Sequence, residues 1–187
     1  MHDLAPLTAL GSTAPRTDTI GPVTIAEAPD WALASVTARL EQDAAAARAQ
    51  VLGVPAPGVA CYASGSDLAA FWIAPDSWMV TAPYRAQPDL ASHLRTQLGP
   101  CASVTDQSDA WVRFDLSAPP EAAQALLERL CNLDTARMTQ GAARRSVIDH
   151  LGCFVIRAGR DAWVIHGPRS SAQSLHHTLL AAARSVF

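Results

Sequence analysis

The sequence has 187 residues, of which 49% are hydrophobic and 17% are charged, and its formal net charge is −3 at pH 7. This length and composition suit one large domain, or two closely joined halves, with a substantial core. Because no basic cluster exceeds the pair Arg144 and Arg145, the sequence argues against nucleic acid as a partner.

No apolar run approaches the roughly 20 residues that a membrane-spanning helix needs, and the opening MHDLAPLTALG does not resemble a signal peptide. We therefore expect a cytoplasmic protein that does not contact a membrane. The four cysteines lie far apart and form no CxxC pair, which favours reduced thiols over disulfides or a structural zinc site.

Residues 1–19 contain proline and glycine and show no apolar periodicity, which predicts an extended N-terminal arm. We expect residues 4–16 in particular to be extended. Leu4, Leu7 and Leu10 are spaced three apart, and their side chains would contact either a partner subunit or the protein's own surface.

Regular elements begin after residue 20. Residues 23–28 predict a strand, and residues 31–40 predict a second strand or a strand leading into a helix. The alanine-rich stretch 43–52, with Gly53 as its stop, predicts a helix.

Two further strands and a helix complete the first half. The strands are predicted at 68–74 and 78–83. Pro88 and Asp89 open a helix whose leucines recur every four residues, and Gly99 closes it.

The second half reads as strand, strand, helix, strand, strand, helix. Its first helix begins at Pro119, where a missing N–H costs nothing, and its last helix follows Ser170 or Ser171. The strands of this half are predicted at 102–104, 111–116, 153–157 and 162–167.

The two halves also match each other in sequence. Four residues of the first half recur at one constant offset in the second: Trp78, Pro83, Leu90 and Leu94 correspond to Trp163, Pro168, Leu175 and Leu179. In addition, VTIAEAPDW resembles VTDQSDAW. The pattern predicts an α+β fold made of a duplicated strand-strand-helix-strand-strand-helix unit, with repeats at 20–100 and 101–187 that share one globular domain.

Motifs for catalysis or cofactor binding are not found in the sequence. There is no GxSxG elbow, no GxGxxG and no GxxxxGK[ST]. His150 and Cys153 form an HxxC pair, but His176 and His177 point about 100° apart on a helix and cannot chelate together, so we predict no metal site.

Several carboxylates at turns are conceivable general bases, namely Asp106, Asp109, Asp134 and Asp149. A short acid at a turn usually accepts hydrogen bonds from the turn's N–H groups, so we predict no catalytic residue. Among the aromatic residues, Phe71 and Trp72 are consecutive in a strand, so alternation must direct one of them away from the core, and an exposed aromatic is often an interface anchor. Phe71, Trp72, Leu7 and Leu10 are therefore our interface candidates.

Ordered matches along the chain resemble the gamma subunit of bacterial heterotetrameric sarcosine oxidase. The segments that carry this resemblance are LTALG, EAPDWALASV, APDSW, SVTDQSDAW, LERLCNLD, IDHLGC and PRSSAQSL. More distantly, the second half is similar to the folate-binding domain of the glycine-cleavage aminomethyltransferases, including a GxAR turn at 141–144. The acidic pair of those enzymes falls on Gly152 and Cys153, which puts folate chemistry in doubt, although Asp149 is nearby.

The resemblance implies a non-catalytic accessory subunit of an enzyme complex that oxidatively demethylates sarcosine to glycine and passes the one-carbon unit to tetrahydrofolate. In that complex FAD, FMN and NAD belong to other chains, and the partners are the alpha, beta and delta subunits, chiefly alpha. The alternative is a free-standing folate-binding protein that senses or transfers one-carbon units. Its pocket would be lined by Asp106, Arg144 and Asp149.

Overall fold

The computed structural model describes residues 6–39 and 56–187, so the helix predicted at 43–52 lies outside the described residues. The chain divides into two compact units. Unit 1 comprises Met1–Pro29, Ala110–Gln140 and Arg144–Phe187, and unit 2 comprises Asp30–Asp109 and Gly141–Ala143. No helix in the described ranges is long and apolar enough to cross a bilayer.

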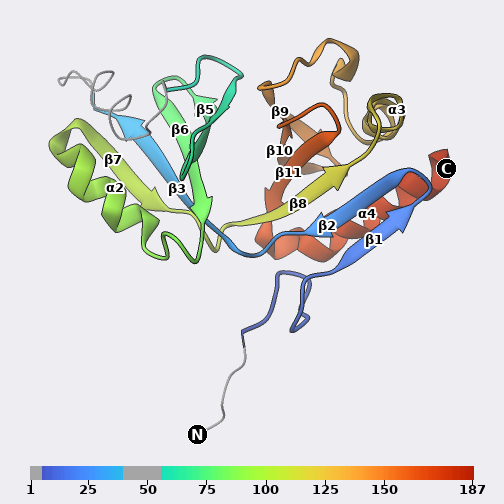
Figure 1. Ribbon diagram of the computed structural model, residues 1–187, viewed down its shortest axis with the longest axis horizontal. Helices are drawn as coiled ribbons and strands as arrows, with labels where there is room; N and C mark the ends of the chain where they lie inside the picture. Colours follow the sequence, from blue (N-terminus) through green and yellow to red (C-terminus); the bar gives the residue numbers. More distant parts are fainter. Residues whose placement is uncertain (1–5, 40–55) are drawn as a thin grey trace, which may run out of the picture. The chain divides into compact units, whose positions relative to one another are not determined.

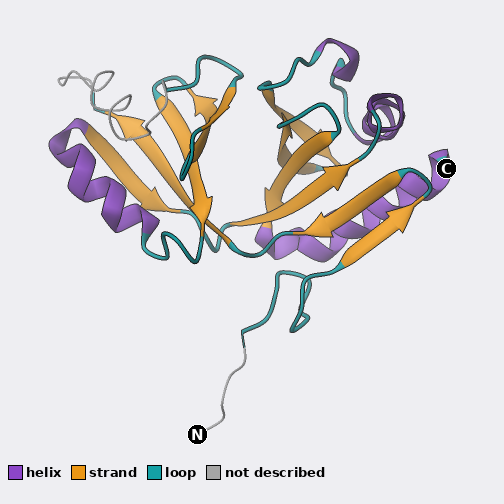
Figure 2. Ribbon diagram, in the orientation of Figure 1, coloured by secondary structure: helices purple, strands orange, loops and turns teal. Residues whose placement is uncertain are grey.

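Unit 1 is built on a six-stranded sheet with the order β1-β2-β8-β11-β10-β9 (Figure 1). Its strands are β1 (Thr17–Ile20), β2 (Val23–Glu27), β8 (Trp111–Ser117), β9 (Ala143–Ile148), β10 (Leu151–Arg157) and β11 (Ala162–Pro168). Its helices are α3 (Pro120–Leu130), α4 (Ala172–Val186) and the short 3-10 helices η2 (Thr135–Arg137) and η3 (Arg169–Ser171). Helix α4 contacts β1 and β11, and Figure 2 shows it lying along one face of the six-stranded sheet.

Unit 2 is built on a five-stranded sheet with the order β4-β5-β6-β3-β7. Its elements are β3 (Trp31–Ala38), β4 (Tyr62–Ser64), β5 (Ala69–Ala74), β6 (Ser77–Pro83), α2 (Leu90–Leu98), η1 (Gly99–Cys101) and β7 (Ala102–Asp106). Helix α2 starts as predicted, because the Asp89 carboxylate accepts a hydrogen bond from the Ser92 N–H at 3.3 Å. Its leucines Leu90, Leu94 and Leu98 are buried against small residues of β3, β5 and β6.

The two sheets repeat the same strand order, which supports the duplication. Strands β4-β5-β6-β3 of unit 2 correspond to β9-β10-β11-β8 of unit 1. The next position in each sheet is filled by a strand from the other repeat: β2 pairs with β8 (Ile25 opposite Leu116), and β7 pairs with β3 (Val104 opposite Val36). The predicted α+β class is confirmed. The repeat boundary at 100/101 does not separate the two units, because the first strand of each repeat pairs in the sheet that the other repeat mainly forms.

The N-terminal arm contains a paired strand and a turn that the sequence did not predict. Residues 17–20 form strand β1, which reaches β2 through a two-residue turn at Gly21, where φ is +54°. The chain also turns between Thr8 and Ser12, where the Thr8 N–H donates to the Ser12 carbonyl at 2.8 Å. The prediction that 4–16 is extended is therefore wrong for this stretch, since a local turn satisfies its backbone groups.

Candidate functional site

A groove of about 680 Å³ runs along helix α4 in unit 1 and is open to solvent. Leu10, Ser12 and Arg16 of the N-terminal segment (residues 6–16) form one wall. Helix α4 and the turn between β9 and β10 form the other. We call it the α4 groove. Its polar lining includes Arg16, Asp149, Gln173, His176, His177 and Arg184.

Helix α4 presents one apolar face to the sheet and one polar face to the groove. Leu175 and Leu179 are fully buried, as their spacing in the sequence predicts. His176 is also buried, and its ring stacks on Phe114 with centroids 5.6 Å apart. His177 is exposed, so the two adjacent histidines point in different directions, as expected on a helix.

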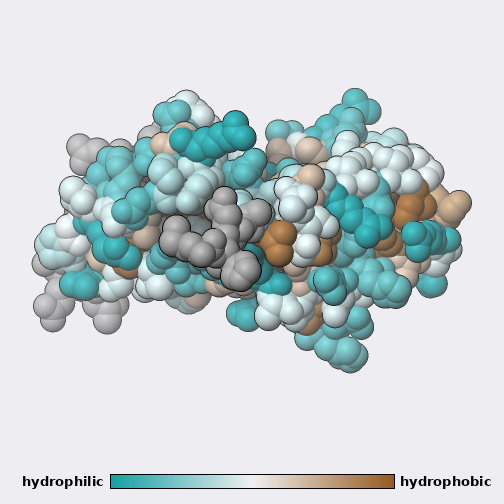
Figure 3. Space-filling view, turned by 90° about the horizontal axis from the view of Figure 1, so that it is seen from below, coloured by the Kyte–Doolittle hydropathy of each residue, from teal (hydrophilic) through white to brown (hydrophobic). Residues whose placement is uncertain are grey.

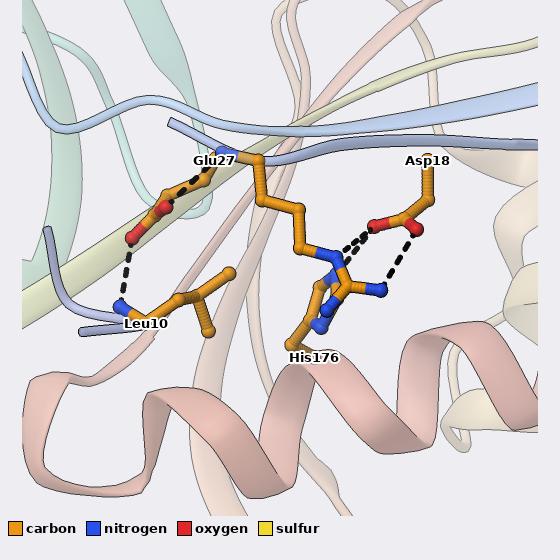
Figure 4. Close-up of polar contacts among 5 residues, drawn as sticks. Leu10, Asp18, Glu27 and His176 are labelled. Carbon is orange, nitrogen blue, oxygen red and sulfur yellow. Dashed lines mark hydrogen bonds and ion pairs between the residues drawn. The ribbon is translucent and has the colours of Figure 1, made fainter. Parts of the chain in front are cut away.

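Asp18 on β1 joins the N-terminal segment to α4 (Figure 4). Its Oδ2 lies 2.9 Å from His176 Nε2 and accepts a hydrogen bond from Arg16 Nε at 2.9 Å, while Arg16 Nη2 donates to Oδ1 at 3.0 Å. The guanidinium of Arg16, and to a lesser extent His176, lowers the pKa of the Asp18 carboxyl against the opposing effect of burial. Asp18 therefore stays ionised and holds both partners in place.

Glu27 at the end of β2 anchors the N-terminal segment from inside the protein. Only 5% of this residue is exposed, and its carboxylate accepts from the Leu10 N–H at 3.0 Å and from the Arg16 N–H at 3.3 Å (Figure 4). The Glu27 N–H in turn donates to the Arg16 carbonyl at 2.8 Å. This buried carboxylate, with its two backbone N–H donors, therefore holds Leu10 and Arg16 of the groove wall against the end of β2.

The cluster of Asp18, Arg16 and His176 has a structural role. The Nε2 atom of His176 faces Asp18 and the ring stacks on Phe114, so the imidazole ties β1 and β8 to α4. Within residues 6–39 and 56–187, no group of three or more His, Cys, Asp and Glu side chains is arranged to hold a metal ion. The polar side chains that line the groove offer hydrogen bonds and charge to a ligand.

The three candidates for a folate pocket are divided between the two units. Asp106, in unit 2, accepts from the Ser108 N–H at 2.9 Å and from the Ser108 hydroxyl at 2.8 Å, and the Ser108 N–H is the main cause of its lowered pKa. In unit 1, Arg144 and Asp149 lie near opposite ends of β9, roughly 16 Å apart along an extended chain. Asp149 accepts from the Thr178 hydroxyl at 2.8 Å. Arg144 and Asp149 therefore cannot both contact one small functional group.

The profile of the sarcosine oxidase gamma subunit family matches residues 38–184. The chain belongs to this family. The match begins at the last residue of β3 and ends within α4, so it leaves out the N-terminal segment, β1, β2 and most of β3.

Solved structures show the same fold as this gamma-family chain. A chain of the heterotetrameric sarcosine oxidase from Corynebacterium sp. U-96 is 23% identical, with a TM-score of 0.75 over 88% of this chain and 85% of that one. The glycine cleavage system aminomethyltransferase T from Bartonella henselae is 18% identical, with a TM-score of 0.63 over 84% of this chain and 48% of that one. A search of curated proteins found no match. The predicted aminomethyltransferase-like fold is thus confirmed.

Cys153 occupies a position where the aminomethyltransferases are expected to carry an acid. In this gamma-family chain its side chain is completely buried on β10, and burial raises the pKa of the thiol to about 11. The thiol is therefore protonated at neutral pH. It cannot replace a carboxylate as a base or as a partner for a cationic intermediate.

The predicted interface residues differ widely in exposure. Phe71 is buried, with 1% of its surface exposed, whereas its neighbour Trp72 is half-buried opposite Trp78. Leu7 is 55% exposed and Leu10 is half-buried. As alternation along the strand predicts, Phe71 is buried and Trp72 is not. Trp72 is more accessible than Phe71, and Leu7 is more accessible than Leu10.

Two important groups were not anticipated from the sequence. Glu27 follows Val23 and Ile25 at a spacing of two, so alternation along β2 already placed its side chain on the buried face. The contact between Asp18 and His176 joins residues far apart in the chain, and no local pattern indicates it.

Proposed function

We propose that this chain is a non-catalytic accessory subunit of a heterotetrameric sarcosine oxidase. The complex would demethylate sarcosine oxidatively to glycine and transfer the one-carbon unit to tetrahydrofolate. The observation that carries the proposal is the family match over residues 38–184. The structural use of Asp18, Glu27, Asp106 and Asp149 in hydrogen bonds supports a role outside the chemistry.

The partners in this proposal are the alpha, beta and delta subunits, with alpha as the main contact. FAD, FMN and NAD would be held by those chains. The fold likeness to the U-96 sarcosine oxidase chain supports assembly with other subunits.

The purified chain is expected to show no turnover by itself. Sarcosine and tetrahydrofolate are added to the isolated protein, and peroxide and methylene transfer are measured, with the reconstituted complex as the positive control. Robust turnover by the isolated chain would contradict the proposal. Calorimetry with a reduced folate on the same preparation tests the alternative, a free folate-binding protein, which micromolar binding would favour.

We propose Trp72, with Leu7, as a contact to the partner subunits. Burial of a tryptophan side chain contributes about 2 kcal/mol or more, so Trp72→Ala is expected to weaken binding to the partner subunits roughly 30-fold. The matched control is Trp111→Ala, since Trp111 packs against Phe154 within unit 1. If Trp72→Ala binds with full affinity but the isolated chain melts earlier, Trp72 belongs to the core.

A further inference from the structure

Three buried side-chain atoms of unit 1 have no hydrogen-bond partner among the described residues. They are Thr135 Oγ1, Arg157 Nε and Trp163 Nε1. The surface of this unit, at the right in Figure 3, is mostly hydrophilic with small separate hydrophobic spots, whereas these three polar atoms lie in the interior. Because an unpaired buried donor destabilises the folded state, native proteins nearly always provide a partner for it.

A continuous set of contacts joins the three residues. Arg157 on β10 and Trp163 on β11 are directly opposite each other in the sheet, and the guanidinium carbon lies 5.4 Å from the centre of the indole ring. Arg157 Nη1 donates to the carbonyl of Met138, and the Met138 N–H donates to the carbonyl of Thr135 at 3.2 Å. The guanidinium therefore links the indole to the segment that contains η2.

The chemistry of the three atoms selects an oxygen ligand. Arg157 Nε–H and Trp163 Nε1–H can only donate, whereas the Thr135 hydroxyl can donate or accept. One oxygen atom can accept from both N–H groups, and if it belongs to water it can also donate to Thr135 Oγ1. Buried waters typically make about three such bonds to polar groups that would otherwise be unsatisfied.

Burial and charge favour water over an anion at this place. Thr135 and Trp163 are each only 3% exposed, so the ligand has to be small enough to lie inside the unit. A carboxylate would lose its hydration there, which costs far more than burying a neutral molecule. The Arg157 guanidinium also has the Met138 carbonyl and the indole face as partners already.

We propose that an ordered water molecule binds between η2 and the β10–β11 hairpin. It accepts hydrogen bonds from Arg157 Nε and Trp163 Nε1 and donates one to Thr135 Oγ1. The water thereby joins η2, which follows α3, to the six-stranded sheet. This inference is independent of the proposed function, because it depends only on the interior of unit 1.

Urea unfolding of the full-length Thr135→Val variant tests the bond to the hydroxyl, since valine keeps the branched shape of threonine without its oxygen. If Thr135 is bonded to the water, the equilibrium constant for unfolding rises about fivefold. If the hydroxyl is truly unpaired, the change removes a buried unsatisfied group, and the constant stays the same or falls, which overturns the proposal. Thr139→Val is the matched control: Thr139 is exposed, and we expect a change within about twofold.

Two further measurements identify the ligand. Wild type is unfolded in sodium formate and in sodium chloride at equal ionic strength, because a bound carboxylate would stabilise the protein by mass action. We expect equal midpoints; a higher midpoint in formate that is absent in Trp163→Phe would replace the water by a carboxylate. A crystal structure of the chain should show a water about 2.7–3.2 Å from all three atoms, and its absence there would refute the site.

Discussion

Replacing Phe114 by alanine is expected to lower the free energy of unfolding by about 3–5 kcal/mol. Phe114 is fully buried on β8, between β2 and β11 in the six-stranded sheet. Its ring also stacks on His176, so its removal leaves a cavity where α4 meets the sheet. Both the lost transfer energy of the ring and the cavity contribute to the cost.

Urea unfolding followed by tryptophan fluorescence measures this change as a shift of the midpoint. Phe187→Ala is the matched control, because it removes the same side chain from a position that is 45% exposed. We expect the control to cost less than about 1 kcal/mol. Equal losses in the two variants would show that Phe114 does not hold α4 to the sheet.

Acidification from pH 6.5 to pH 4.5 is expected to destabilise the protein by about 2–3 kcal/mol through His166. His166 is 2% exposed on β11, and burial, with a smaller contribution from the charge of Arg113, lowers its pKa to about 3. In the unfolded chain the imidazole binds a proton near pH 6.5. Between these two values the unfolded state binds more protons, so the free energy of unfolding falls as the pH is lowered.

The pH dependence of urea unfolding in wild type and His166→Gln checks this expectation. The variant should lose most of the slope in this range, whatever its stability at pH 7, because glutamine does not titrate. Asp18 acts at lower pH: since its pKa is lowered in the folded state, its contribution is present above about pH 4 and lost below it. Equal slopes in the two proteins would show that His166 is not the group responsible.

Local sequence patterns determined most elements of this protein. Proline and aspartate at Pro88 and Asp89 marked the start of α2, and the steps of three and four along α4 identified its buried face, because these signals depend on neighbours within a few residues. The match between Trp78 and Trp163 identified the duplication, and β6 and β11, which carry them, lie at corresponding positions of the two sheets. The ordered segments that resemble the gamma subunit, such as APDSW and LERLCNLD, identified the family.

Three of the short edge strands were not predicted in this way. Strands β1, β4 and β9 lie at sheet edges and are only three to six residues long. An edge strand exists because a neighbouring strand offers it hydrogen bonds, and its own few residues carry little periodic signal. For this reason β1 was not recognised within and beside the arm predicted at 1–19.

Tertiary structure alone decided which strands pair. Alternation along β2 and β7 tells which side chains face inward, but it does not tell which backbone will accept their hydrogen bonds. The exchange of these two strands between the repeats, and the contact of Asp18 with His176, are fixed by pairings between distant parts of the chain. The sequence by itself thus determined the elements, their buried faces and the family, whereas the assembly of the sheets and of the α4 groove depends on long-range contacts that no local pattern encodes.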